Sequence, residues 1–217
     1  MRIKEFEVID LRVPTSDSLL GSDPFHRKPN YSVVLTKLFG GNGIEGISVN
    51  FTIGAGTDWV AYAVRDLMQL IVGGSLDEFT KDPGGFHRML LNHHQLRWLG
   101  DGMGRMVIGS VMNALWDLWA KEEGKPLWKL LVDLPPKTII DCIDWRYLKD
   151  ALDPAEALEI LEQGLASKSE REQRMSQKGP KAYSTAGWLG LSDDEIVKTI
   201  EEVKKQGLNL SLIHISE

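Results

Sequence analysis

Apolar and polar side chains alternate from the first residues of the chain. Over residues 3–13 the apolar positions change phase between Val8 and Ile9. Alternation with a period of two predicts a β-strand, and the change of phase predicts a bulge or a twist within it. Two further apolar runs, at 31–38 and 47–53, lie on either side of a glycine-rich turn and predict a hairpin. The chain therefore begins with three predicted strands that form an antiparallel sheet.

A long loop separates the first two predicted strands. Residues 14–30 are rich in Ser, Asp, Gly and Pro and show little periodicity. Loops of this length inside a compact domain are usually functional or disordered. The loop therefore requires an explanation in terms of function.

Helical periodicity follows the sheet. Apolar residues recur at spacings of three and four over about 58–71 and again over about 105–123, and glycine follows each segment. A three-stranded sheet followed by helices predicts an α+β fold for residues 1–135.

The pattern changes after two prolines at 135–136. Residues 138–143 form a short β-branched run that predicts a strand, and a helix is expected to open at Asp153, with proline at its first position and glutamate at its third. A second predicted helix has Ser192 as its N-cap and ends at Gly207. A lone βα pair cannot bury its own sheet face, so a further strand is expected after this helix.

The composition excludes several classes of function. With 42% hydrophobic and 26% charged residues, the chain has the balance of a soluble globular protein. No apolar run approaches the ~20 residues of a membrane span and no signal peptide precedes the first strand, so we expect a cytoplasmic protein without a membrane partner. A net charge of -6 opposes nucleic acid as a partner, and acidic residues interrupt the one basic cluster, at 168–181. The glutamates and lysines of residues 168–178 predict a solvated helix face or a mobile loop. The only cysteine, Cys142, lies in an apolar run and is expected to be an unreactive thiol.

Local motifs favour packing over chemistry. The glycines of 100–104 lack the third glycine of a dinucleotide-binding fingerprint, because Arg105 occupies its position, and the P-loop motif is absent from the sequence. Three histidines are expected at the surface and three tryptophans in core or domain-interface packing: His87, His93, His94, Trp116, Trp119 and Trp128.

A family resemblance gives these elements a context. Residues 113–131, NALWDLWAKEEGKPLWKLL, closely resemble the segment that joins capping domain to barrel in the mandelate racemase-like branch of the enolase superfamily. Four further stretches resemble L-fuconate dehydratases in particular: 10–16, 95–100, 142–147 and 183–190. The resemblance implies an α+β capping domain at 1–135, followed at 136–209 by the first βα part of a truncated TIM-like barrel.

The resemblance also assigns the long loop. In the family this loop closes over the barrel mouth, and the positions that match its substrate contacts are Gly21, Ser22, Asp23 and Tyr31. A glycine permits close backbone approach, Ser and Asp hydrogen-bond to hydroxyl groups, and Tyr supplies a wall with a polar tip. The family commonly has a small residue at the position of Ser22. A solvated Gly-Ser-Asp-Pro turn remains the alternative interpretation.

The implied reaction is the dehydration of a sugar acid, L-fuconate, to its 2-keto-3-deoxy product. A base removes the proton next to the carboxylate, Mg²⁺ stabilises the enediolate, and an acid assists loss of the β-hydroxyl. The family supplies these groups from a Lys-x-Lys strand, three acidic ligands and a His-Asp pair, none of which matches a position in this chain. We therefore expect the complete enzyme to be a hydro-lyase and a homo-oligomer, and this chain alone to be inactive.

The last residues offer two interpretations. Residues 210–217, where the Lys-x-Lys strand is expected, contain no lysine and read as the translation of a sequencing adapter, although they also fit an amphipathic strand. We expect them to be non-native. Two other functions stay open: a sister acid-sugar dehydratase with another substrate, and a non-catalytic cap-like module for binding or interaction.

Overall fold

The computed structural model describes residues 1–94, 96–148, 150–179 and 182–210. The chain divides into two compact units. Met1–Leu11 and Ser32–Ala166 form unit 1, whereas Arg12–Tyr31 and the residues from Ser167 onward form unit 2. The predicted domain boundary between residues 135 and 136 stays a prediction.

Unit 1 contains the predicted three-stranded antiparallel sheet. Its strands lie in the order β1 (Ile3–Leu11), β2 (Ser32–Gly40) and β3 (Glu45–Thr52). The irregularity in β1 lies between Ile3 and Glu5, so a bulge between Val8 and Ile9 is wrong. The change of apolar phase instead marks a change of face, because Val8 is buried in the core and Ile9 lies on the opposite side of the strand.

Strand β3 turns its small and polar residues toward the core. Gly46, Ser48 and Asn50, which we call the seam, face helix α4 (Met103–Glu122). A Cβ on Gly46 would lie 2.1 Å from the carbonyl oxygen of Ala114, so only glycine permits this close approach. The Ser48 hydroxyl donates to the Ser110 carbonyl at 2.7 Å, and the Asn50 amide donates to the Met106 carbonyl at 2.7 Å. The apolar phase of β3 is consequently exposed, with Val49 and Phe51 at 56% and 55%.

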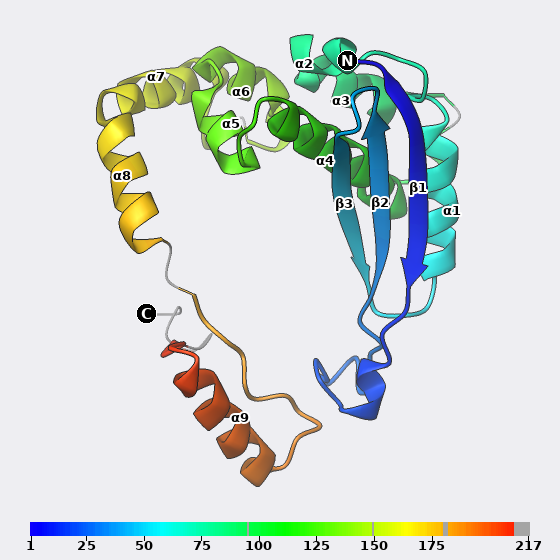
Figure 1. Cartoon of the computed structure of the whole chain (residues 1–217), viewed down its shortest axis with the longest axis vertical. Coiled ribbons are helices and arrows are strands. Elements are labelled where there is room, and N and C mark those ends of the chain that lie inside the picture. Colours follow the sequence, from blue (N-terminus) through cyan, green and yellow to red (C-terminus); the bar gives the residue numbers. More distant parts are fainter. Residues whose placement is uncertain (95, 149, 180–181, 211–217) are drawn as a thin grey trace. The chain divides into compact units, whose positions relative to one another are not determined.

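Helices cover one face of the sheet, as Figure 1 shows. Helices α1 (Thr57–Met68) and α4 confirm the two predicted at about 58–71 and 105–123, and α2 (Leu76–Lys81) and α3 (Pro83–Leu91) lie between them in sequence. Phe79 of α2 is fully buried at the centre of an aromatic cluster with Phe86, Trp116 and Trp119. The predicted packing of Trp116 and Trp119 is confirmed, whereas Trp128 is half exposed.

The residues after Pro135 form a helix, so the strand predicted at 138–143 is wrong. Helix α6 (Pro136–Cys142) begins with proline at its first position, where the missing N–H costs nothing. Lys137 and Asp141 pair one turn apart at 2.7 Å, and the Asp141 carbonyl accepts from Arg88 of α3 at 2.9 Å. Ile140 is buried as well. These tertiary contacts favour the helix over the strand that the local β-propensity predicts. The flanking helices of unit 1 are α5 (Leu127–Asp133) and α7 (Pro154–Gly164).

Unit 2 contains the loop at 12–31 and helices α8 (Lys168–Lys178) and α9 (Asp193–Lys205). Helix α8 has no buried residue, which confirms the prediction of a solvated helix face. Ser192 caps α9 in a capping box and Gly207 follows it with φ of 83°, as predicted. The Ser184 N–H donates to the Leu210 carbonyl at 3.0 Å, so the segments before and after α9 lie side by side. Residues 211–217 of the predicted adapter lie outside the described residues.

Short 3-10 helices complete the secondary structure: η1 (Thr15–Asp17), η2 (Arg97–Leu99), η3 (Trp145–Tyr147) and η4 (Leu165–Ser167). Across the part of the chain that the structure describes, no helix is both long and apolar enough to span a membrane.

Candidate functional site

The loop at 12–31 closes on itself at its base. The Thr15 hydroxyl donates to the Pro29 carbonyl at 2.8 Å and accepts from the Tyr31 N–H at 2.9 Å. Next to it, the Ser16 hydroxyl donates to the side-chain oxygen of Asn30 at 2.6 Å. Ends that meet in this way are typical of an Ω-loop, a compact form that frequently carries function. These hydrogen bonds give the loop a closed base, and a solvated Gly-Ser-Asp-Pro turn remains the alternative interpretation of its tip, where Pro24 and Phe25 are exposed.

Gly21 and Tyr31, two of the predicted site residues, meet inside the loop. The Tyr31 hydroxyl donates to the Gly21 carbonyl at 2.9 Å. Gly21 adopts a φ of 78°, and a Cβ at this position would lie 2.2 Å from the Tyr31 ring. Only glycine allows both the backbone conformation and the close approach of the ring. The structure thus brings these two residues together over ten positions of sequence.

The side chain of Ser22 is buried and points toward the backbone of Gly190. It is 3% exposed, and its hydroxyl oxygen accepts a hydrogen bond from the Gly190 N–H at 2.8 Å. Little of its surface is left for a ligand in this conformation. Its predicted role as a direct substrate contact stays a prediction.

Asp23 is held within the loop by His26. One carboxylate oxygen accepts from the N–H groups of Phe25 and His26 at 2.8 and 2.6 Å, and the other lies 3.1 Å from Nδ1 of His26. The side-chain hydrogen bond from His26 lowers the pKa of Asp23 below its ordinary value near 3.8. The sequence analysis did not single out His26, although an Asp three residues before a His is a possible signal for such a turn.

The pairing of Asp23 with His26 predicts that this turn loses stability at low pH. A carboxylate whose pKa is lowered by folding stabilises the loop above its ordinary pKa and loses that contribution as the pH falls through the lowered value. We therefore expect the amide resonances of Phe25 and His26 to titrate with a midpoint below 3.8. Asp23→Asn, which keeps one acceptor oxygen but cannot titrate, should abolish this transition in NMR spectra. A wild-type midpoint at or above the ordinary value contradicts the pairing.

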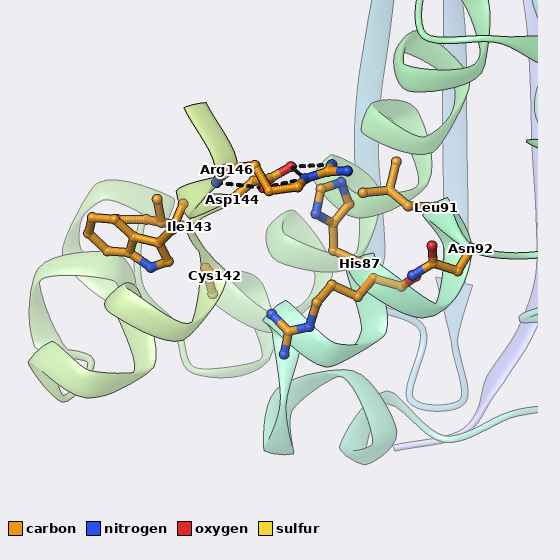
Figure 2. A pocket seen from close by; sticks show the side chains of 9 residues that line it. His87, Leu91, Asn92, Cys142, Ile143, Asp144 and Arg146 are labelled. Atoms are coloured by element: carbon orange, nitrogen blue, oxygen red, sulfur yellow. Dashed lines mark hydrogen bonds and ion pairs between the residues drawn. The ribbon is translucent and has the colours of Figure 1, made fainter. Parts of the chain in front are cut away.

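A second candidate site is a cleft of about 440 Å³ in unit 1, between α3 and the residues that follow α6. Figure 2 shows His87 extending toward the ion pair of Asp144 and Arg146. Arg146 Nε donates to both carboxylate oxygens of Asp144, at 2.9 and 3.1 Å. This bond lowers the pKa of Asp144 and raises that of Arg146. Because Arg146 is exposed and Asp144 is only partly buried, solvent screens the pair, which contributes little to stability.

His87 departs from the sequence expectation. It lines the cleft and is half-buried, so it is less exposed than the fully solvated histidine that the sequence suggests. Burial, followed by the nearby Arg105 guanidinium, lowers the pKa of His87 and favours the neutral imidazole. His93 is also partly buried, with its Nδ1 without a hydrogen-bond partner among the described residues, whereas His94 is exposed as predicted.

The thiol of Cys142 lines the same cleft. Burial raises the pKa of Cys142, and the carboxylate of Asp141 raises it further, so the reactive thiolate is disfavoured near neutral pH. We expect iodoacetamide to alkylate the folded chain more slowly than the urea-unfolded chain. Since Cys142 is the only cysteine, intact-mass spectrometry reports its modification directly. Faster alkylation in the folded chain contradicts the expectation of an unreactive thiol.

Metal ligands do not gather in this part of the protein. Among the described residues, no group of three or more His, Cys, Asp or Glu side chains could hold a metal ion. The carboxylates of the described residues therefore do not form the acidic triad expected of a Mg²⁺ site.

Comparison with known proteins identifies the fold. Residues 23–132 match the family model of the mandelate racemase / muconate lactonizing enzyme N-terminal domain. The chain belongs to this family and thus to the enolase superfamily, which confirms the resemblance and the α+β capping fold with its three-stranded antiparallel sheet.

Individual relatives extend along nearly the whole chain. Human mitochondrial enolase superfamily member 1 is 42% identical over 95% of this chain and 48% of its own length. L-Galactonate dehydratase from Hypocrea jecorina is 36% identical over 94% of this chain and 46% of its own length. The chain spans about half the length of the curated relatives it matches.

Solved structures agree. The crystal structure of human mitochondrial enolase superfamily member 1 matches with a TM-score of 0.89 at 40% identity and covers 97% of this chain and 49% of that chain. An L-talarate/galactarate dehydratase mutant liganded with Mg and L-glucarate has a TM-score of 0.60 at 15% identity, over 97% of this chain and 42% of that one. The latter shows a common fold only.

Proposed function

We propose that this chain forms the N-terminal half of an acid-sugar dehydratase, in which the loop at 12–31 contacts the substrate. The observation that carries the proposal is the closed loop in which Gly21 and Tyr31 meet, at the positions that resemble the substrate contacts of the family. A relative of similar sequence named L-galactonate dehydratase supports the reaction class. The compact loop supports a role in binding, since its shape is set before a ligand arrives.

The residues of this chain bind and enclose the substrate in the proposed reaction. The Tyr31 ring supplies an apolar wall that excludes water, and the carboxylate of Asp23, which retains exposed surface, is an acceptor for sugar hydroxyls. The base, the acid and the ligands of the proposed Mg²⁺ ion belong to the rest of the complete enzyme. When bound, that ion supplies a charge that stabilises the enediolate formed on removal of the proton next to the carboxylate.

The substrate is proposed to be L-fuconate, which would lose water to give 2-keto-3-deoxy-L-fuconate. L-Galactonate is the second candidate, because it is the substrate in the name of the Hypocrea jecorina relative. The two hypotheses share the reaction and the sugar stereochemistry, and they differ in the group at C6, which is a methyl in L-fuconate and a hydroxymethyl in L-galactonate.

A panel assay tests the reaction and separates the substrates. A complete protein that carries this chain as its N-terminal half is incubated with Mg²⁺ and, separately, with L-fuconate, L-galactonate or L-talarate. Formation of the 2-keto-3-deoxy acid is followed as its semicarbazone. We expect the highest kcat/KM with L-fuconate, and an EDTA-treated sample serves as the control. If only L-galactonate is turned over, the substrate is L-galactonate and not L-fuconate. Failure with every sugar acid contradicts the proposed function.

A further inference from the structure

Two segments that lie far apart in sequence meet in unit 2. The turn at 19–22 belongs to the loop, and residues 189–190 precede helix α9. The Ser22 hydroxyl oxygen accepts from the Gly190 N–H at 2.8 Å, and the Ser22 carbonyl accepts from the Leu189 N–H at 3.2 Å. Ser22 thus accepts hydrogen bonds from two consecutive backbone N–H groups. We call Leu19, Ser22, Leu189 and Gly190 the clasp.

The clasp is closely packed from both sides. A Cβ on Gly190 would lie 2.8 Å from both the Leu19 Cβ and the Ser22 Oγ, so a larger residue cannot occupy this position without movement. Leu19 has a φ of 55°, a backbone region that residues with a side chain rarely adopt, and its carbonyl accepts from the Ser22 N–H at 3.2 Å. A strained turn that is hydrogen-bonded at both ends indicates a shape that the surroundings enforce.

The loop residues differ in their burial, and this difference indicates different roles. Ser22 is 3% exposed, whereas Asp23 and Tyr31 keep accessible surface. A hydroxyl that is buried and engaged with backbone donors is poorly placed to select among sugar hydroxyls. It is well placed to fix Gly21, its direct neighbour, whose carbonyl accepts from the Tyr31 hydroxyl.

We propose that Ser22 is a positioning residue, which fastens the loop at 12–31 to residues 189–190 and thereby holds Gly21 and Tyr31 in their arrangement for the sugar acid. The fastening stands on the contacts of unit 2, and its purpose rests on the proposed function. Ser22 therefore acts through its neighbours and not as a direct contact of the substrate.

Amide exchange in this chain, measured by NMR, tests the fastening. Ser22→Ala removes the acceptor of the Gly190 N–H, and we expect that amide to exchange roughly tenfold faster than in the wild type. Ser18→Ala is the matched control, because its hydroxyl also lies in the loop and, among the described residues, bonds only within it, to the Thr15 carbonyl at 3.2 Å. The control should leave the Gly190 amide unchanged. Equal exchange in the wild type and Ser22→Ala overturns the proposal.

A second variant approaches the clasp from the other segment. Gly190→Ala places a Cβ against Leu19 and Ser22 and should accelerate exchange at the Ser22 and Leu189 amides. Amides of α4 in the same spectra show whether a variant has lost its general fold. Undisturbed loop amides in a folded Gly190→Ala protein also overturn the clasp.

The positioning role is tested in the complete enzyme. Ser22→Ala should raise KM for the sugar acid severalfold more than it lowers kcat, because a displaced binding loop weakens substrate binding, whereas a loss of folded protein lowers the apparent kcat alone. An unchanged KM together with faster Gly190 exchange overturns the positioning role. If no sugar acid is turned over by the wild type, the proposed function fails, and the exchange experiment still decides whether the clasp exists.

Discussion

Phe79→Ala is expected to lower the free energy of unfolding of unit 1 by about 3–5 kcal/mol, the largest effect of any single substitution considered for this chain. Phe79 is 0% exposed, and its ring makes edge-on contacts with Phe86, Trp116 and Trp119 at centroid distances of 5.7, 5.0 and 6.2 Å. The truncation removes these contacts and leaves a cavity that neighbouring helices cannot fill. Urea denaturation followed by tryptophan fluorescence measures the loss.

A matched phenylalanine controls for the change of residue type. Phe25 lies in the loop and is 92% exposed, so Phe25→Ala should alter the free energy of unfolding by no more than about 0.5 kcal/mol. A similar loss for both variants would show that Phe79 is not at the centre of the core.

Gly21→Ala is expected to disrupt the substrate loop. At a φ of 78° alanine costs about 1–2 kcal/mol in backbone strain alone, and its Cβ would lie 2.2 Å from the Tyr31 ring, which must then move. The displaced ring gives up the hydrogen bond from its hydroxyl to the Gly21 carbonyl, which contributes about 1 kcal/mol. In the complete enzyme we expect kcat/KM for the sugar acid to fall by at least about tenfold, which steady-state kinetics measures.

Gly43 provides a control that distinguishes the backbone strain of a Gly→Ala substitution from the steric clash of the added Cβ. Gly43 has a φ of 84°, and apart from its chain neighbours no described residue has an atom within 4 Å of its would-be Cβ, so Gly43→Ala carries the backbone cost without a steric clash. We expect it to lower stability slightly and to leave kcat/KM unchanged. If Gly21→Ala and Gly43→Ala affect kcat/KM equally, the close approach of Gly21 and Tyr31 does not matter for binding.

Much of unit 1 could be predicted because its signals are local. The alternating strands, the two long helices and the cap at Asp153 all depend on neighbours within a few residues. The helix at α6 could not be predicted in this way. Its β-branched run at 138–143 indicates a strand, and the contacts that favour a helix come from α3 through Arg88.

The orientation of strand β3 shows a second limit. Its regular apolar phase would ordinarily be assigned to the core, yet the buried phase is the seam of Gly46, Ser48 and Asn50. The seam is buried because α4 approaches closely enough to hydrogen-bond with it. The sequence of β3 alone does not predict how closely α4 approaches.

The family resemblance selects positions for the candidate site, whose contact with a substrate stays a prediction, and it does not give the orientation of their side chains. The family resemblance selected Gly21, Ser22, Asp23 and Tyr31, and the structure shows how they differ. The hydroxyl of Ser22 is turned toward a partner 168 residues away, and Asp23 is engaged by His26. The contact between Ser22 and Gly190 depends on the folded chain and leaves no periodic signal in the sequence, whereas the contact between Asp23 and His26 is local.

The proposed function requires that the loop at 12–31 contact a sugar acid. Hydrogen–deuterium exchange of the complete enzyme, with and without saturating sugar acid, tests it most directly. We predict slower exchange across residues 12–31 when the acid is bound, and unchanged exchange across α2 and α3, which belong to unit 1. Unchanged exchange across the loop, under conditions in which the acid is turned over, would contradict the account.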